Sequence, residues 1–170
     1  QPFNFEEVDE EKGVFSKFKS KEGKFNQGTP SFSKDRKTVY FTQWTGLDAR
    51  KESYNIYRSS QYESGLWSAP IKLKAPINSP GVRYMHPSIT ADGKRLYFVS
   101  DKTGGFGKLD IWYSNIDTLG AFSEPINAGS KINTKDDDVS PFYSDTIKTL
   151  FFSSQGRIGL GGLDIYQATY

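Results

Sequence analysis

Few side chains in this sequence could do chemistry, and the first candidate is its single histidine, His86. The chain has no cysteine, which excludes disulfides, thiolate nucleophiles and cysteine-based metal sites. Without a second histidine or a cysteine, a zinc site at His86 is not expected. Serine is abundant, but no Gly-x-Ser-x-Gly nucleophile elbow is present. We therefore expect His86 to pack, to form hydrogen bonds or to contact a ligand, rather than to belong to a catalytic triad.

The densest acidic cluster is the run Asp136, Asp137 and Asp138. Oxygen-rich loops can bind calcium, although the Asp-x-Asp-x-Asp-Gly pattern of a calcium loop is missing here. The alternative is a solvated loop whose carboxylates accept hydrogen bonds from backbone N–H groups. The three aspartates are thus weak calcium candidates, and the sequence predicts no other metal and no cofactor.

Two glycine-rich stretches, residues 104–107 and 159–162, could suggest phosphate binding. Neither ends in the Gly-Lys-Ser/Thr of a phosphate-binding loop, and each precedes a predicted strand rather than a helix. We therefore expect wide turns that need the conformational freedom of glycine.

These candidates lie within a repeat of about 55 residues. Similar segments begin at Pro30, Pro87 and Pro141, with spacings of 57 and 54 residues. Each reads as a short strand, a polar turn and a strongly apolar strand. The near-continuous apolar character of the second strand predicts burial on both of its faces.

Two further motifs recur at the same period. One begins at Asn55, Asp110 and Asp164, and the other reads GLWSAPIKL from Gly65 and GAFSEPINA from Gly120. Each repeat therefore holds four short antiparallel strands, which is the blade of a β-propeller. The predicted fold is all-β, a partial ring of such blades.

The polar residue that opens the third strand, Asn55, Asp110 or Asp164, recurs in every blade. A short polar side chain there can form hydrogen bonds with the backbone of the preceding turn. An active site is normally built once per ring, so this repetition favours a structural role over a catalytic one.

The repeats also predict the organisation of the chain. Residues 1–28 would end a preceding blade, 29–75 and 76–128 would form whole blades, and 129–170 an incomplete one. We expect a fragment of a larger propeller, with apolar faces at the two ends of the arc. The competing account is a small closed ring, in which residues 14–18 pair with residues 164–168.

The motif strings resemble the Pro-Asp, WD40-like β-propeller repeat of the TolB-like group. They most resemble the propellers of OmpA-family outer-membrane proteins of Bacteroidota, some of which are associated with type IX secretion and gliding motility. The resemblance rests on residues 28–33, 39–42, 86–87, 92–98 and 159–165. At Asp35-Arg36 and Asp145-Thr146 the chain departs from the Asp-Gly of the family turn, so those turns could differ in shape.

The resemblance implies a periplasmic protein associated with the outer membrane. Peptidoglycan would be bound only through an OmpA-like domain that this sequence does not contain. The expected function is a non-catalytic scaffold for protein partners in an envelope complex. The alternatives are a glycan or peptide receptor at the mouth of the propeller channel and the accessory propeller of a peptidase. Tyr84, His86 and Asp138 are the residues expected at that mouth.

Composition excludes two further classes of partner. The formal net charge is only +2, with both signs scattered along the chain, so no basic stripe for nucleic acid is present. No apolar run approaches the roughly 20 residues of a membrane-spanning helix.

Overall fold

Short runs of β-branched and aromatic residues alternate with polar turns, and these runs form the strands of the protein. The computed structural model describes residues 25–45 and 53–169, and within these ranges it contains eleven strands and no helix. No helix in this part of the chain therefore has the length and apolar character to cross a membrane.

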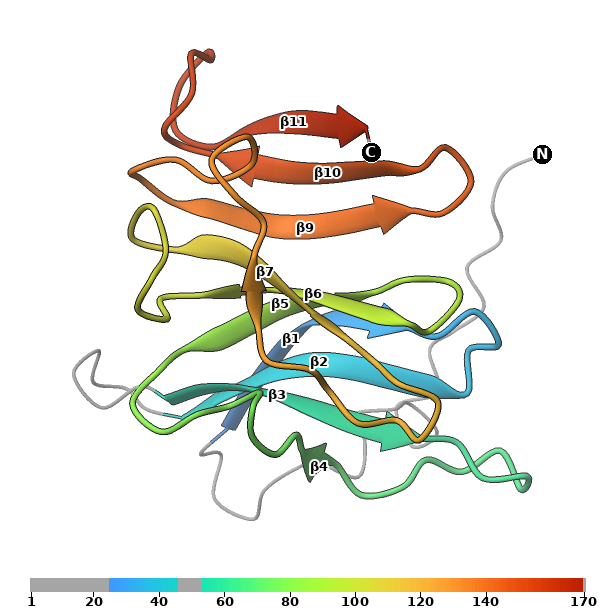
Figure 1. Ribbon diagram of the computed structural model, residues 1–170. Helices are drawn as coiled ribbons and strands as arrows, with labels where there is room; N and C mark the ends of the chain where they lie inside the picture. The colour runs from blue at the N-terminus through green and yellow to red at the C-terminus, as the bar shows by residue number, and fades with distance from the viewer. Residues whose placement is uncertain (1–24, 46–52, 170) are drawn as a thin grey trace.

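The strands form three antiparallel sheets that follow one another in chain order from the bottom to the top of Figure 1. The first sheet has the order β1-β2-β3-β4, the second β5-β6-β7-β8, and the third β9-β10-β11. The strands are β1 (Phe25–Phe32), β2 (Thr38–Thr45), β3 (Ser53–Ser60), β4 (Ile71–Lys72), β5 (Tyr84–Ile89), β6 (Arg95–Ser100), β7 (Asp110–Asn115), β8 (Ile126–Asn127), β9 (Asp138–Ser144), β10 (Thr149–Ser154) and β11 (Asp164–Thr169).

These sheets are propeller blades, and the two complete four-stranded blades confirm the predicted fold class. The first strand of each blade contacts the first strand of the next, since β1 contacts β5 and β5 contacts β9. The first sheet starts at Phe25, four residues before the predicted beginning of that blade. Residues 14–18, which the closed-ring account pairs with the last strand, lie outside the described residues.

The turn between the first and second strands is the same in the first and second blades. In the second blade, Asp92 Oδ1 accepts hydrogen bonds from Thr90 Oγ1 at 2.6 Å and from the Lys94 amide at 3.0 Å. Asp35 makes the equivalent bonds in the first blade, also at 2.6 and 3.0 Å. Arg36 adopts a left-handed φ of 57° where the second blade has Gly93 at 69°. The Asp35-Arg36 sequence therefore forms the same turn as Asp-Gly, and its one unfavourable feature is the left-handed backbone of Arg36.

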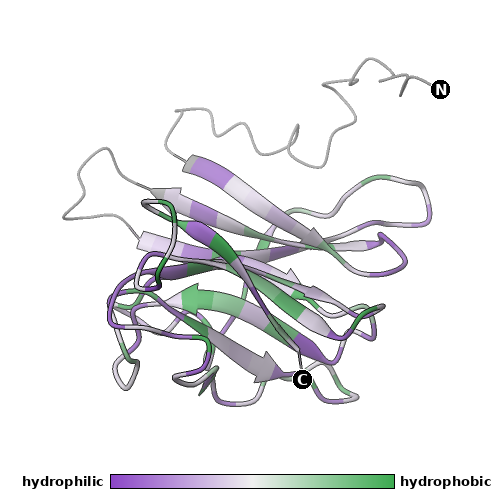
Figure 2. Cartoon of the chain, turned by 90° about the horizontal axis from the view of Figure 1, so that it is seen from above, coloured by the Kyte–Doolittle hydropathy of each residue, from purple (hydrophilic) through white to green (hydrophobic). Residues whose placement is uncertain are grey.

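The core lies between the sheets, and β6 shows how the sequence builds it. Leu96 and Phe98 pack on the first blade's side, whereas Tyr97 and Val99 pack on the third blade's side. All four side chains are almost completely buried, which confirms the predicted burial of this strand on both faces. Each buried large side chain contributes roughly 1.5–3 kcal/mol by leaving water. Figure 2 shows hydrophobic segments on strands inside the stack of sheets, whereas the surrounding turns carry both hydrophilic and hydrophobic residues.

The face of the third sheet that points away from the second blade is apolar and exposed. Phe142 on β9 and Ile165 on β11 retain 61% and 78% of their surface. The corresponding face of the second sheet carries Tyr97 and Ile111, which the third blade covers. An apolar face at this end of the arc is what the repeat pattern predicts for a partial ring.

Candidate interaction site

The repeated aspartates anchor the turn between the second and third strands of a blade. Asp110 is 2% exposed, and its carboxylate accepts hydrogen bonds from the Phe106 amide at 2.5 Å, the Gly107 amide at 3.2 Å and Asn127 Nδ2 at 3.1 Å. A Cβ atom on Gly105 would overlap this carboxylate. The glycine-rich turn is thus explained in part by the close approach of Asp110, and not by backbone freedom alone.

The other two members of the motif differ in burial. Asp164 is half-buried, and its Oδ2 accepts a hydrogen bond from the Gly161 amide at 3.3 Å. A Cβ atom on Gly159 would overlap its carboxylate, as at the equivalent glycine of the second blade. Asn55 is 9% exposed, and the turn that precedes it lies outside the described residues.

Two buried asparagines that the sequence analysis did not single out make the next layer of contacts. Asn78 Oδ1 accepts the Ile56 amide at 2.8 Å, and its Nδ2 donates to the Ile56 carbonyl at 2.7 Å. Asn133 forms the same pair of bonds with Ile111, at 2.8 and 2.9 Å. Each side chain amide therefore pairs with the third strand of its blade as a strand residue would. The available signal was an Ile-Asn pair that recurs after 55 residues.

The residue before the repeated proline is left-handed in all three blades. Thr29, His86 and Ser140 have φ values of 50°, 50° and 54°, a region that non-glycine residues rarely adopt. Each lies at an irregularity in the pairing of the first and second strands. A bulge of this kind turns the backbone amide away from its own sheet.

The amides released by these bulges join neighbouring blades. The His86 amide donates to Thr42 Oγ1 of the first blade at 2.9 Å, and the Ser140 amide donates to His86 Nδ1 at 3.3 Å. Burial lowers the pKa of the His86 imidazole below its ordinary value of 6.5, which keeps the ring neutral and able to accept this bond. His86 also lines a shallow groove of about 160 Å³ with residues 29–31, 87–88 and 140–142.

The other two residues predicted at the channel mouth are not available to a ligand, which corrects that prediction. Tyr84 is 0% exposed and packs in the core between the first and second blades. Asp138 is also 0% exposed, and its Oδ2 accepts hydrogen bonds from the amide and hydroxyl of Thr134 at 2.5 and 2.9 Å. Position in the repeat identified both residues as leading into a first strand, but packing turned both side chains inward.

The three aspartates given as weak calcium candidates have different partners in the structure. Asp136 forms an ion pair with Lys108 at 3.4 Å, and Asp138 is bonded to Thr134. The Asp137 carbonyl accepts the Gln155 amide at 2.9 Å. Among the described residues, no group of three or more acidic, histidine or cysteine side chains could hold a metal ion.

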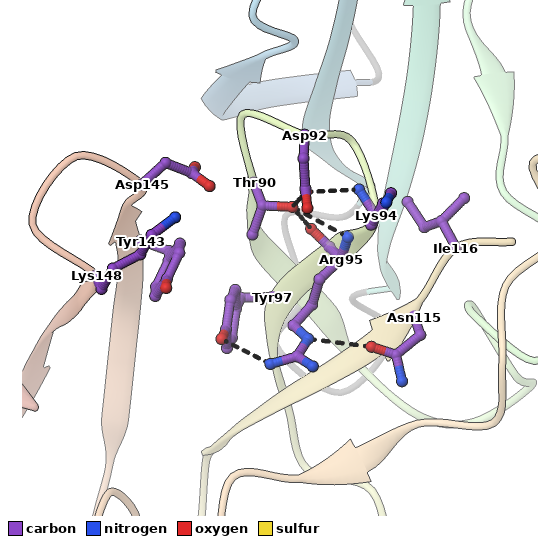
Figure 3. A pocket seen from close by; sticks show the side chains of 10 residues that line it. All are labelled: Thr90, Asp92, Lys94, Arg95, Tyr97, Asn115, Ile116, Tyr143, Asp145 and Lys148. Atoms are coloured by element: carbon purple, nitrogen blue, oxygen red, sulfur yellow. Dashed lines mark hydrogen bonds between the residues drawn. The ribbon is translucent and has the colours of Figure 1, made fainter. Parts of the chain in front are cut away.

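A larger pocket, of about 450 Å³, opens between the first hairpin of the second blade and the third blade (Figure 3). It lies at the hairpin ends of β5 and β6 and of β9 and β10. The second blade provides seven of its lining residues and the third blade three. They are Thr90, Asp92, Lys94, Arg95, Tyr97, Asn115 and Ile116, together with Tyr143, Asp145 and Lys148.

Arg95 is the most firmly positioned cation of this pocket. Its guanidinium carbon lies 4.4 Å from the centre of the Tyr113 ring and 5.9 Å from that of Tyr97. Its Nε donates to Asn115 Oδ1 at 3.0 Å, and one terminal nitrogen donates to the Tyr97 hydroxyl at 3.3 Å (Figure 3). Stacking and hydrogen bonding together hold the charged plane in one orientation.

An aromatic wall and two bonded carboxylates complete the pocket. The rings of Tyr97 and Tyr143 stack across the junction, with centroids 5.7 Å apart and planes inclined by 25°. Asp145 Oδ2 accepts the Ala91 amide of the neighbouring blade at 2.5 Å. Hydrogen bonding from Thr90 and then from the Lys94 amide lowers the pKa of Asp92, so this carboxylate is ionised at neutral pH.

The same junction one blade earlier has different residues. At the positions of Arg95, Tyr143 and Asp145, the repeat places Thr38, Ile89 and Ala91. The guanidinium, the second tyrosine and the bridging carboxylate are therefore particular to the junction of the second and third blades. Residues shared by all blades build the fold, whereas residues that depart from the repeat at one junction are candidates for recognition.

Comparison with known proteins identifies the fold. No protein-family model matches the sequence, and no curated protein matches it. Among solved structures, TolB from Acinetobacter baumannii superposes with a TM-score of 0.52 at 17% identity, over 85% of this chain and 30% of that one. A puromycin-hydrolyzing peptidase of Mycobacterium tuberculosis superposes with a TM-score of 0.55 at 14% identity, over 87% of this chain and 22% of that one. This chain thus spans less than a third of either protein, and it has the fold of part of a TolB-like β-propeller.

Proposed function

We propose that this chain is a non-catalytic interaction module of the bacterial cell envelope, which presents a rigid arc of propeller blades to a protein partner. The location in the periplasm, at the outer membrane, and membership of an OmpA-family protein of Bacteroidota rest on the resemblance of the repeat motifs. A link to type IX secretion or gliding motility is part of the same proposal. Peptidoglycan would be bound by a separate domain.

One observation carries the proposal: the buried polar side chains that recur in the blades form hydrogen bonds with backbone groups of their own blade and so are not available to a partner. Asp110 and Asn133 are buried and bonded to the turn and strand beside them. Residues of this kind stabilise a scaffold and leave recognition to non-repeated surface residues. The pocket around Arg95 includes such residues, because Arg95, Tyr143 and Asp145 depart from the repeat, whereas other lining residues recur in the first blade.

Two other functions share this fold. An accessory propeller of a peptidase is favoured by the likeness to the puromycin-hydrolyzing peptidase. A receptor for a small glycan or peptide would use the groove beside His86 or the pocket beside Arg95. The first alternative requires a hydrolase domain in the same protein, and the second requires no protein partner at all.

The test is affinity capture from a Bacteroidota envelope extract with the immobilised chain, followed by reconstitution with each purified candidate. A captured protein that binds again in purified form, and that protects blade amides from hydrogen exchange, supports the proposal. Retention of glycans or small peptides alone would contradict it. Co-purification of a hydrolase whose activity depends on the chain would favour the accessory role instead.

A further inference from the structure

Three buried polar atoms of the third blade have no hydrogen-bond partner within the part of the chain that the structure describes. They are Asp138 Oδ1, Ser154 Oγ and Arg157 Nε. Asp138 is 0% exposed and Ser154 is 1% exposed, so bulk solvent does not reach these side chains. We infer that the three atoms bind one internal water molecule, which joins the third sheet to the segment that leads into it. The inference concerns how the arc is held rigid, and it does not depend on which partner the arc presents itself to.

The three side chains lie over the same face of the third sheet. Asp138 and Ser154 are paired directly across β9 and β10, so they are neighbours on one face. Phe152 lies two residues before Ser154 on β10 and therefore shares that face. The guanidinium carbon of Arg157 is 5.5 Å from the centre of the Phe152 ring. This is the face that packs against the second blade.

The segment before β9 closes the region from the other side. Thr134 donates its amide and its hydroxyl to Asp138 Oδ2, at 2.5 and 2.9 Å. One terminal nitrogen of Arg157 donates to the carbonyls of Lys131 and Ile132, at 2.6 and 3.1 Å. The same short segment therefore holds one oxygen of the carboxylate and one end of the guanidinium. Asp138 Oδ1 and Arg157 Nε are the atoms that still require partners.

The first blade shows how the same two strand positions are joined without water. At the positions of Asp138 and Ser154 it has Gln27 and Gln43, paired in the same way. Gln27 Nε2 donates to Gln43 Oε1 at 3.1 Å, so two long side chains meet directly. Asp138 and Ser154 are shorter, and no hydrogen bond joins them. A buried gap between polar groups that cannot reach each other is where protein interiors commonly hold a single water molecule.

The mixture of donor and acceptor atoms selects water over a metal ion. The carboxylate oxygen of Asp138 accepts hydrogen bonds, whereas the Nε–H of Arg157 can only donate. A cation would suit Asp138 Oδ1 and Ser154 Oγ, but it would leave the Nε–H without an acceptor and place two positive charges together. Water can accept from the Nε–H, donate to Oδ1 and bond the hydroxyl of Ser154 in either direction. That gives the roughly three hydrogen bonds typical of a buried water molecule.

The test is a pair of high-resolution crystal structures, one of the wild-type chain and one of the double variant Asp138→Gln with Ser154→Gln, which copies the pair of the first blade. In the wild type, a single density peak should lie about 2.7–3.2 Å from each of the three atoms, the range of ordinary hydrogen bonds. In the double variant, the two glutamines should bond each other directly and displace the peak. Ser100→Ala is the matched control, because Ser100 is the equivalent serine of the second blade and its Oγ already accepts the Lys102 amide at 3.1 Å.

A measurement in solution complements the crystals. Magnetic relaxation dispersion of the water ¹⁷O signal counts the long-lived water molecules inside a protein. The wild type and Ser100→Ala should give the same count, and the double variant one fewer. Circular dichroism and urea unfolding of each variant show that a lost water molecule does not reflect lost structure.

Four outcomes would overturn the inference. They are the absence of density between the three atoms, a direct bond of Asp138 Oδ1 to Ser154 or Arg157, a peak with oxygen ligands at the calcium distances of about 2.3–2.6 Å, and an unchanged water count in the folded double variant. The wild-type structure alone decides the first three, so the inference remains testable even if the double variant does not fold. None of these outcomes bears on the proposed function, which affinity capture tests separately.

Discussion

Replacing Asn133 by alanine tests whether a side chain amide can substitute for a missing strand residue in a blade. Asn133 is 2% exposed and forms three hydrogen bonds, one from the Ile111 amide, one to the Ile111 carbonyl and one to Asn127 Oδ1, at 2.8, 2.9 and 2.9 Å. The carbonyl of Ile111 also accepts the Ala128 amide at 3.0 Å, so it keeps a partner in the variant. The principal effect of the substitution is therefore that the buried Ile111 N–H loses its hydrogen-bond acceptor.

The size of the effect follows from these bonds. Each intramolecular hydrogen bond contributes about 0.5–1.5 kcal/mol, so the three bonds of Asn133 together contribute about 1.5–4.5 kcal/mol. A domain has only about 5–15 kcal/mol of stability, so the variant should remain folded but with a clearly lower midpoint. Asn78→Ala, at the equivalent position of the first blade, should lower the free energy of unfolding by more, because Asn78 also has a left-handed φ of 61° that alanine adopts less readily than asparagine.

The assay is urea unfolding at neutral pH, followed by tryptophan fluorescence and by circular dichroism. Asn26→Ala is the control, because Asn26 is exposed and surface substitutions change stability by less than about 0.5 kcal/mol. A free energy for Asn133→Ala within that same margin of the wild type would refute the reasoning. An equal loss in the Asn26 variant would show that the substitution of asparagine, and not its buried bonds, is responsible.

Three further predictions concern the remaining motif residues. Asp110→Ala should lower the free energy of unfolding by about 1–3 kcal/mol because two turn amides lose their buried acceptor, and Asp164→Ala should cost less because Asp164 is half-buried; urea titration compares the two. The pKa of His86 is lower in the folded state than its ordinary 6.5, so the folded protein binds fewer protons and stability should fall as the pH drops below 6.5. Unfolding titrations between neutral and mildly acidic pH would show this slope, and His86→Gln should remove it; an identical slope in that variant would exclude His86 as its source. Thermal melts with added calcium and with a chelator should superimpose, whereas a rise of several degrees with calcium would support a site at residues 136–138.

Much of the blade could be predicted from the sequence because its signals are local. The period of about 55 residues, the hairpin signals and the apolar runs all lie within one repeat. The apolar run of Leu96, Tyr97, Phe98 and Val99 predicted burial on both faces, and the two core clusters that share this strand confirm it. Alternation along a strand places successive side chains on opposite faces, so an unbroken apolar run requires a neighbour on each side.

The sites were less predictable because they depend on contacts between repeats. Tyr84 and Asp138 occupy the positions expected at a channel mouth, yet packing buries both completely. His86 accepts an amide from the next blade, 54 residues away, and Asn78 bonds a strand 22 residues before it. No pattern within one segment contains such a partner.

The sequence alone determined the repeat, the four strands of each blade and the absence of cysteine and of a second histidine, because these follow from residue types and short-range spacing. Tertiary structure alone decided which polar residues are buried and which meet at a surface. The pocket at Arg95 shows the difference, since Tyr143, Asp145 and Lys148 reach it from the next blade. Their meeting depends on how two sheets pack face to face, and that relation is set by the whole core rather than by any local pattern.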